Sequence, residues 1–159
     1  MRTAVITLVL RMASDLVTLY FDDEAYSKAS PGQYAMVWIP GGEEIPMSLS
    51  TINLGGESSL TVRDVGEATK ALCDMKEGDK VGVRGPFGRG YIITGDSPLI
   101  VAGGTGVASL APLAEAFIEK GVKPTFILGA RTEMDLAFRD RLEKLLGDRV
   151  VLATDDGSC

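Results

Sequence analysis

Apolar and polar residues alternate in short runs over the first part of the chain, which is the pattern of half-buried β-strands. Residues 3–12 and 16–22 are rich in Val, Leu and Thr and are separated by a polar break, so we expect a hairpin. Further strand-like runs, bounded by glycine and proline turn signals, occupy residues 30–42, 46–53, 58–65 and 80–88. This succession of short strands predicts a closed antiparallel barrel.

One segment of this first part has a different period. In residues 68–78 the apolar residues Ala71, Leu72 and Met75 have helical spacing, and Gly78 is placed to end a helix. We therefore expect one short helix between the strands.

The pattern changes after Gly90. Apolar runs and amphipathic stretches then alternate, in the order strand 97–104, helix 107–121, strand 123–130, helix 133–147 and strand 149–156. We expect Gly121 to end the first of these helices. Strands and helices joined by short links predict a parallel sheet, here half of a doubly wound domain. The expected domains are therefore a barrel at 1–92 and a partial α/β domain at 93–159.

Composition narrows the chemistry. The chain has 159 residues and a net charge of −6, which argues against nucleic acid or an anionic membrane as a partner. It contains no histidine, which excludes a Ser-His-Asp triad and histidine-ligated metals, and we expect no metal site. Cys73 and Cys159 are far apart and lack a nearby second cysteine, so we expect no disulfide and a cytoplasmic location. No apolar run approaches the length of a membrane span.

Residues 104–109, with the sequence GTGVAS, match the pattern G-x-G-x-x-small between a strand and a helix. Glycines at such a turn have two explanations. They can serve tight packing alone, or Gly103, Gly104 and Gly106 can bring the backbone close to a phosphate at the N-terminus of the helix. Both explanations are compatible with the sequence.

An ordinary dinucleotide fingerprint has an acidic residue about 20 residues after its glycines, where it binds a ribose. Here the second strand of the α/β part ends in LGART at 128–132, so Arg131 occupies that position. The glycine motif also follows a complete β-domain instead of opening the chain. We infer that the barrel supplies part of any nucleotide site.

Other motifs follow one another along the chain: PGQYAMVWIPG (31–41), IPMSLS (45–50), VGEAT (65–69), GPFGRGY (85–91), AGGTGVAS (102–109), GAR (129–131) and TDDGS (154–158). In order and spacing they resemble the ferredoxin–NADP reductase superfamily, in which a six-stranded flavin barrel precedes a nicotinamide-nucleotide domain. Pro-x-Ser at 46–48, LGART and TDDGS look most like the electron-transfer subunits of dihydroorotate dehydrogenase within that superfamily.

The resemblance implies an oxidoreductase subunit that binds FAD and NAD(P) and passes electrons between NAD(H) and a partner catalytic dehydrogenase subunit of pyrimidine biosynthesis. Such subunits also carry a [2Fe-2S] cluster, whose four cysteines would follow residue 159, so we expect the cluster only in a full-length form and interpret this chain as a truncated one. Flavin subunits of related hydrogenases or NADH:ferredoxin oxidoreductases remain an alternative. A non-catalytic nucleotide-binding or docking module is a second alternative.

For the flavin ring, the resemblance implies that Ser48 donates a hydrogen bond near flavin N5, the atom that accepts the hydride. Ser48 would otherwise be an ordinary strand serine. Pro46 and Met47 would form an apolar wall along the ring, or Met47 would belong to the protein core.

Around the FAD phosphates the resemblance implies contacts from Thr61, Val62, Arg63, Gly66, Ala68 and Thr69. Thr69 is also placed to cap the short helix. Ile45 stands where the family has an arginine that pairs with the flavin phosphate, so we expect Arg63 to supply this charge or else to be a solvated surface residue.

The nicotinamide half of NAD(P) would meet Gly103, Gly104, Thr105, Gly106 and Val107. Arg131 would contact an adenosine phosphate or ribose, or else pair with neighbouring charges. Asp155 and Asp156 would contact a ribose or cap a turn.

Overall fold

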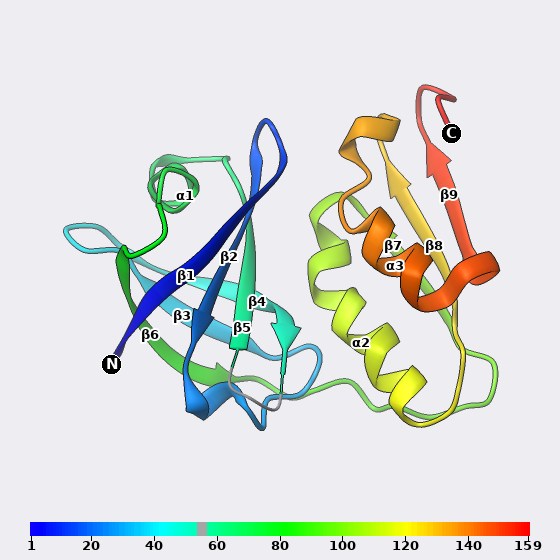
Figure 1. The fold of residues 1–159 in the computed structure, drawn as a ribbon, viewed down its shortest axis with the longest axis horizontal. Coiled ribbons are helices and arrows are strands. Elements are labelled where there is room, and N and C mark those ends of the chain that lie inside the picture. Colours follow the sequence, from blue (N-terminus) through cyan, green and yellow to red (C-terminus); the bar gives the residue numbers. More distant parts are fainter. Residues whose placement is uncertain (54–56) are drawn as a thin grey trace.

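The computed structural model describes residues 1–53 and 57–159, and within these ranges the first part of the chain forms a closed antiparallel barrel (Figure 1). Its strands are β1 (Arg2–Ala13), β2 (Leu16–Asp22), β3 (Tyr34–Trp38), β4 (Glu44–Ile52), β5 (Glu57–Arg63) and β6 (Lys80–Phe87). Their order is β1-β2-β5-β4-β3-β6, so the long strand β1 closes the barrel by pairing with both β2 and β6. The predicted six-stranded barrel and its first hairpin are confirmed for the described residues.

The alternating pattern turns one face of each strand into the barrel interior. In β2, Val17, Leu19 and Phe21 are buried in this core. Tyr26, which follows β2, joins them: its ring meets the Phe21 ring edge-on with centroids 5.6 Å apart, and its hydroxyl donates to the Arg84 carbonyl oxygen at 3.0 Å. The core therefore extends from the strands into the loop after β2.

The short helix forms, but α1 (Glu67–Cys73) ends well before Gly78, so the predicted end of this helix is wrong. The residues after α1 make a tight turn, in which the Asp79 carboxylate accepts the Lys76 N–H at 2.8 Å. Gly78 lies in this turn with a φ of +91° and donates its N–H to the Ile6 carbonyl oxygen. The glycine serves the turn into β6 and not the end of the helix.

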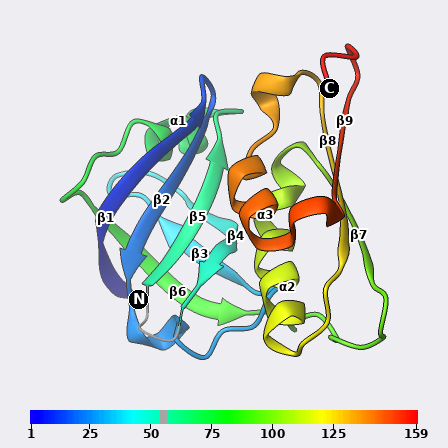
Figure 2. The same ribbon diagram turned by 45° about the vertical axis from the view of Figure 1, so that its right-hand side comes forward.

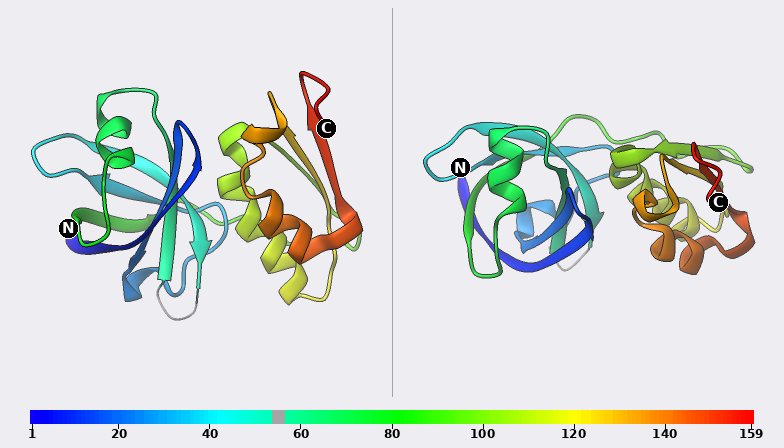
Figure 3. Two further views of the ribbon diagram at one scale, coloured as in Figure 1. Left: turned by 45° about the horizontal axis from the view of Figure 1, so that its top comes forward. Right: turned by 90° about the horizontal axis from the view of Figure 1, so that it is seen from above.

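The second part of the chain contains β7 (Leu99–Gly103), α2 (Val107–Glu119), β8 (Thr125–Ala130), α3 (Arg139–Leu146) and β9 (Val150–Thr154). The strands form the predicted parallel sheet, and their order in it is β7-β8-β9. Gly121 follows α2 with a φ of +77°, which agrees with its predicted place at the helix end. Both helices lie on the sheet face that is turned toward the barrel (Figures 1 and 3). No helix in residues 1–53 and 57–159 has the length and apolar character needed to cross a membrane.

The predicted helix at 133–147 is shorter than expected. Residues Glu133–Asp135 form a 3₁₀ turn, and α3 begins only at Arg139. The intervening residues 136–138 are all buried, in a cluster that also contains Leu16 of the barrel. Because a helix cannot turn three consecutive side chains to the same side, contact with the barrel overrides the helical pattern here.

The α/β unit covers one outer wall of the barrel, where α2 packs against β4 (Figure 2). The outward side chains of this wall carry hydroxyl groups, and we call it the hydroxyl wall. They are Thr18 of β2, Ser50 of β4, and Ser59 and Thr61 of β5, all buried. The hydroxyl oxygen of Thr61 lies 2.9 Å from those of Thr18 and Ser50, and the Ser50 and Ser59 hydroxyls are 2.8 Å apart. The hydroxyls therefore satisfy one another and can be covered without losing hydrogen bonds.

We expect Tyr26 to make the free energy of unfolding fall between pH 10 and about 12. Burial raises the pKa of the Tyr26 phenol from 10.0 to about 12. In that window the unfolded chain loses the phenol proton while the folded protein keeps it, so stability decreases as the pH rises.

The variant Tyr26→Phe lacks this titration, although loss of the hydrogen bond to Arg84 should cost it about 1 kcal/mol at pH 7. Denaturant unfolding of both proteins from pH 7 to pH 12 should show the smaller decline for the variant. An equal decline in the two proteins would contradict this assignment.

Candidate functional site

The turn between β5 and α1 opens onto a first cleft of about 690 Å³. We call it the α1 cleft; it is lined by residues 39–43, Ile45, residues 65–69 and Ala71. It contains Gly66, Ala68 and Thr69, which the sequence predicted as phosphate-binding residues. The structure thus brings these three together at one surface.

Thr69 shapes this turn from within. Its hydroxyl oxygen accepts the N–H groups of Val65 and Gly66, each at 3.0 Å, and the hydroxyl donates to the Gly66 carbonyl oxygen at 2.9 Å. Thr69 therefore caps α1, which is the alternative that the sequence left open for it.

Gly66 itself has no structural reason to be a glycine. Its φ of 176° is extended backbone that any residue adopts, and a Cβ added at Gly66 would meet nothing within 4 Å. Neither backbone conformation nor packing inside the protein requires glycine at this position. The space above Gly66 is open to a ligand.

Ser48 lies in a row of residues that crosses three strands. It pairs with Tyr34 of β3, which pairs in turn with Phe87 of β6, and the Tyr34 and Phe87 ring centroids are 5.8 Å apart. Directly paired residues point to the same face of a sheet, so a hydroxyl stands beside an aromatic surface. Pro46 and Ser48 are exposed, whereas the Met47 side chain packs against the barrel core. For Met47 the structure thus favours the core position.

A second cleft, of about 460 Å³, lies at the carboxyl edge of the parallel sheet, where ligands of open α/β sheets bind. This β7 cleft is lined by Arg63, Gly103, Gly104, residues 129–131, Asp135 and residues 153–155. The structure therefore brings Gly103, Gly104, Arg131 and Asp155 together, as the sequence predicted for one nucleotide site.

The glycines of this cleft are not explained by packing. A Cβ added at Gly103, Gly104 or Gly106 would meet nothing within 4 Å, and only Gly104, with a φ of +52°, has a backbone that favours glycine. Thr105 and Gly106 are exposed in the 3₁₀ turn that leads into α2. No described side chain caps this turn or α2, and the Val107 N–H already bonds to the Gly104 and Thr105 carbonyl oxygens, so an anion here would meet the N–H groups of the turn that precedes α2.

Arg63 lies in the β7 cleft instead of the α1 cleft, where a partner of the flavin phosphate was expected. Its Nη1 is 2.8 Å from Asp15 Oδ2. Arg131 enters the same cleft from the end of β8, with its Nε 3.6 Å from Asp135 Oδ2. A guanidinium has five N–H donors, so a single carboxylate contact leaves each arginine able to bind an anionic ligand.

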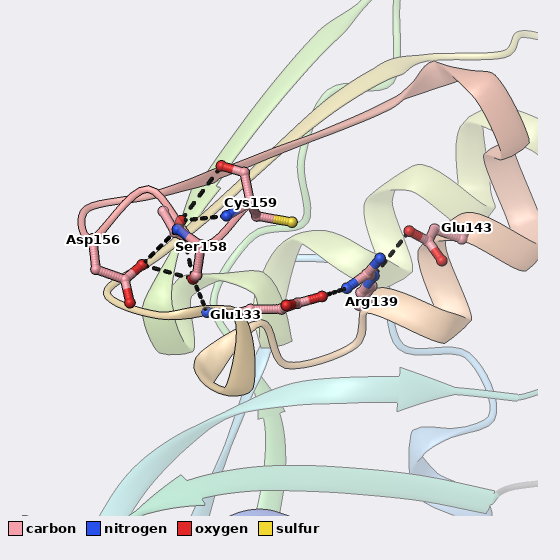
Figure 4. A network of polar contacts seen from close by, with 7 residues as sticks. Glu133, Arg139, Glu143, Asp156, Ser158 and Cys159 are labelled. Carbon is pink, nitrogen blue, oxygen red and sulfur yellow. Dashed lines mark hydrogen bonds and ion pairs between the residues drawn. The ribbon is translucent and has the colours of Figure 1, made fainter.

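The two predicted aspartates after β9 make different contacts, and Figure 4 shows those of Asp156. Asp156 Oδ1 accepts the Ser158 N–H at 3.0 Å and the Ser158 hydroxyl at 2.7 Å, and these bonds lower the pKa of the Asp156 carboxyl. The Ser158 hydroxyl oxygen also accepts the Glu133 N–H at 2.9 Å, which ties this turn to the segment after β8. Asp156 therefore holds a turn, whereas Asp155 lines the β7 cleft.

Three further residues predicted to contact a cofactor have their side chains in the interior. Thr61 belongs to the hydroxyl wall, Val62 to the barrel core, and Val107 to the core of the α/β unit. Burial on the inner face of each element leaves these side chains no access to either cleft. Any contact of these three residues with a cofactor would therefore come from the main chain, and their role in binding stays a prediction.

The sequence did not single out Tyr34, Phe87 or Arg141. Tyr34 and Phe87 stand beside the turn segments PGQ and GP, and this position is the signal that could have marked them. Arg141 lies among several charged residues of an amphipathic helix, and nothing in the local pattern distinguishes it. Its contacts across the two units appear only in the fold.

The two clefts favour ligands of one chemical kind. Open glycine turns next to helices suit phosphate groups in both clefts, and in the β7 cleft arginine forks can also bind them bidentately. The row of Ser48, Tyr34 and Phe87 offers an aromatic surface and a hydroxyl to a planar ring. The residues present therefore fit ligands that join phosphates to a planar ring.

No protein-family model matches the chain. It is 42% identical over 156 residues to a probable dihydroorotate dehydrogenase B (NAD(+)) electron transfer subunit of Methanocella arvoryzae, an alignment that covers 98% of this chain and 58% of that protein. Proteins of the same name from Methanocaldococcus jannaschii and Archaeoglobus fulgidus are 47% and 41% identical, over 80% and 96% of this chain and 47% and 60% of theirs. The chain thus spans about half or somewhat more of the length of these curated relatives.

Solved structures show the same fold. An NADH-dependent reduced ferredoxin-NADP oxidoreductase, studied for flavin-based electron bifurcation, superposes with a TM-score of 0.87 at 32% identity, covering 100% of this chain and 59% of that one. Phthalate dioxygenase reductase superposes with a TM-score of 0.82 at 21% identity, covering 98% of this chain and 52% of that one.

The order of barrel and parallel sheet and the sequence identities agree. Along nearly its whole length the chain is homologous to electron transfer subunits of dihydroorotate dehydrogenase B, and its fold is that of ferredoxin–NADP reductase-like proteins.

Proposed function

We propose that the chain is the FAD- and NAD(P)-binding part of a flavoprotein electron-transfer subunit, which passes electrons between NAD(H) and a partner catalytic dehydrogenase, as in dihydroorotate dehydrogenase B of pyrimidine biosynthesis. One observation carries this proposal. Gly66 and Gly103 line two separate clefts, and neither backbone conformation nor packing requires glycine at either position. An open main chain at a turn is what a closely bound ligand needs.

The α1 cleft and the Ser48 row would together hold FAD. Gly66 and Ala68 would face its pyrophosphate, and the aromatic row would receive its ring. Because Ile45 replaces the family's arginine, no arginine or lysine lines the described part of this cleft. Main-chain N–H groups would therefore bind the flavin phosphates.

The β7 cleft would hold NAD(P). The turn from Gly103 to Gly106 would face the nicotinamide half, and Asp155 a ribose. Arg63 and Arg131 would pair with its phosphates, one from the barrel and one from the sheet. Both parts of the chain would thus contribute to binding one nucleotide.

When bound, the two cofactors supply the redox chemistry, a hydride transfer between nicotinamide C4 and flavin N5. The protein's part is to orient the two rings and to exclude water from between them. The Ser48 hydroxyl would donate a hydrogen bond at the flavin. This chemistry needs no histidine as acid or base, in agreement with the composition of the chain.

Further parts of the proposal concern the whole protein. The partner dehydrogenase would make the subunit part of a hetero-oligomer, and a [2Fe-2S] cluster would belong to a longer form. A cytoplasmic location remains a prediction from the two unpaired cysteines. A flavin subunit of a related hydrogenase or NADH:ferredoxin oxidoreductase would use the same two clefts and differ in its partner.

A non-catalytic nucleotide-binding or docking module is the second candidate. The observation that favours it is Ile45, which leaves the α1 cleft without the family's arginine. A module of this kind would take up no FAD and would not oxidise NADH in the presence of an artificial acceptor. The first experiment below separates the two candidates.

Titration of the purified chain with FAD should give a yellow complex with flavin absorbance. In Gly66→Ala the added methyl group meets no protein atom within 4 Å, so the melting temperature should change little. The same methyl group would occupy ligand space, so FAD affinity should fall at least about tenfold, or roughly 1.4 kcal/mol. Gly103→Ala is the matched control and should bind FAD like the wild type. Absence of FAD uptake by the wild type, or equal affinity of Gly66→Ala, would contradict the proposal.

The reciprocal variant tests the β7 cleft. Gly103→Ala should weaken NADH binding at least about tenfold, because the methyl group enters space that the protein leaves open and that the proposed ligand would occupy. Its FAD content and its thermal stability should stay at the wild-type level. NADH binding is measured by fluorescence titration, and reduction of bound FAD by the loss of visible flavin absorbance. If Gly66→Ala impaired NADH binding as much as Gly103→Ala, the assignment of two separate sites would be wrong.

A further inference from the structure

Arg141 of α3 connects the α/β unit with the barrel. Its Nε and Nη2 each lie 2.8 Å from a carboxylate oxygen of Glu115 in α2, which is a bidentate pair. Its Nη1 donates to the Ser50 carbonyl oxygen at 2.8 Å and to the Thr51 hydroxyl at 3.3 Å, both in β4. The guanidinium also lies over the Phe138 ring, 5.3 Å from its centroid. One side chain thus joins α2, α3 and β4.

The carbonyl that Arg141 binds belongs to a β-bulge. Leu49 pairs with Leu60 and Thr51 pairs with Ser59, so Ser50 stands between two ladder pairs as the extra residue. A bulge interrupts the hydrogen bonds of the ladder and bends the strand. Arg141 supplies the donor for the Ser50 carbonyl oxygen and so holds the bulge in place.

This bond links the two halves of the proposed site. The bulge follows Ser48 closely on β4, and Glu115 lies on the helix that begins after the Gly104–Gly106 turn. The Arg141 and Glu115 side chains are 23% and 33% exposed, so the pair is largely shielded from water. The apolar contacts nearby, such as those of Leu16, are non-directional, whereas the Arg141 bonds define an orientation.

We propose that Arg141 is a positioning residue for hydride transfer, which sets the orientation of the β7 cleft relative to Ser48 by holding α2 against β4. The inference rests on the proposed function. Arg141 lines a different cleft, of about 700 Å³ between α2 and β4, and belongs to neither cofactor cleft. Loosening the Arg141 contacts would leave the residues around each cofactor in place and would change only the alignment of the two cofactors.

The test compares the FAD-loaded wild type with Arg141→Lys, which keeps the charge but loses the planar fork that binds Glu115 and Ser50 together. Affinities for FAD and NADH should stay within about twofold, while the rate of flavin reduction at saturating NADH should fall about 10- to 100-fold, because a misplacement of about 1 Å can cost about 100-fold. The charge-transfer absorbance of the NADH–flavin complex, which reports ring alignment, should weaken with the rate.

Arg139→Lys is the matched control. Arg139 lies on the same helix and pairs with Glu133 and Glu143, both within the α/β unit, so its replacement should leave the reduction rate unchanged. Glu115→Gln keeps the Arg141 bond to Ser50 and should have an intermediate rate. A variant that retains the Arg141 bond to Ser50 should reduce its flavin faster than Arg141→Lys does, at a rate closer to that of the wild type. This result would support the inference.

The outcomes separate this inference from the function on which it rests. A wild-type rate per bound flavin in Arg141→Lys would overturn the inference while the proposed function stands. Parallel loss of FAD binding and thermal stability, with an unchanged rate per bound flavin, would show a purely structural role and overturn it too. A wild type that binds no FAD, or whose flavin NADH does not reduce, would overturn the proposed function and this inference with it.

Discussion

A barrel wall that carries hydroxyl groups can be buried only if each of them finds a hydrogen-bond partner. In the hydroxyl wall, Thr18, Thr61, Ser50 and Ser59 bond to one another in an unbroken chain. The wall therefore loses no hydrogen bonds when the α/β unit covers it, and its small side chains let α2 pack against β4. The relative placement of the two units depends on this contact.

Because α2 is held against the barrel, the Gly104–Gly106 turn at its start contacts the end of β5. Arg63 stands at that end and so reaches the β7 cleft from the barrel. The α1 cleft begins shortly after Arg63 in the chain, at Val65 and Gly66. One end of β5 thus leads to both clefts, so the proposed FAD and NAD(P) sites both include residues at or just after the end of this strand.

Glycine stands at different positions of the chain for different physical reasons, and the structure distinguishes these reasons. Gly121 has a φ of +77° and ends a helix, and a Cβ at Gly32 would lie 2.9 Å from the Tyr91 ring. Gly66 and Gly103 have neither an unusual φ nor a close neighbour. A motif alone cannot distinguish these cases, because the same residue serves conformation, packing and ligand approach.

The sequence by itself determined the strands, the order of helices and strands in the α/β part and the location of the glycine turns, because these follow from local periodicity and turn chemistry. Tertiary structure decided that residues 136–138 are not helical, that Arg63 lines the β7 cleft and that Arg141 joins the two units. Each of these depends on which distant segment a residue meets. Local periodicity records which face of an element is buried, but it does not record the partner that buries it.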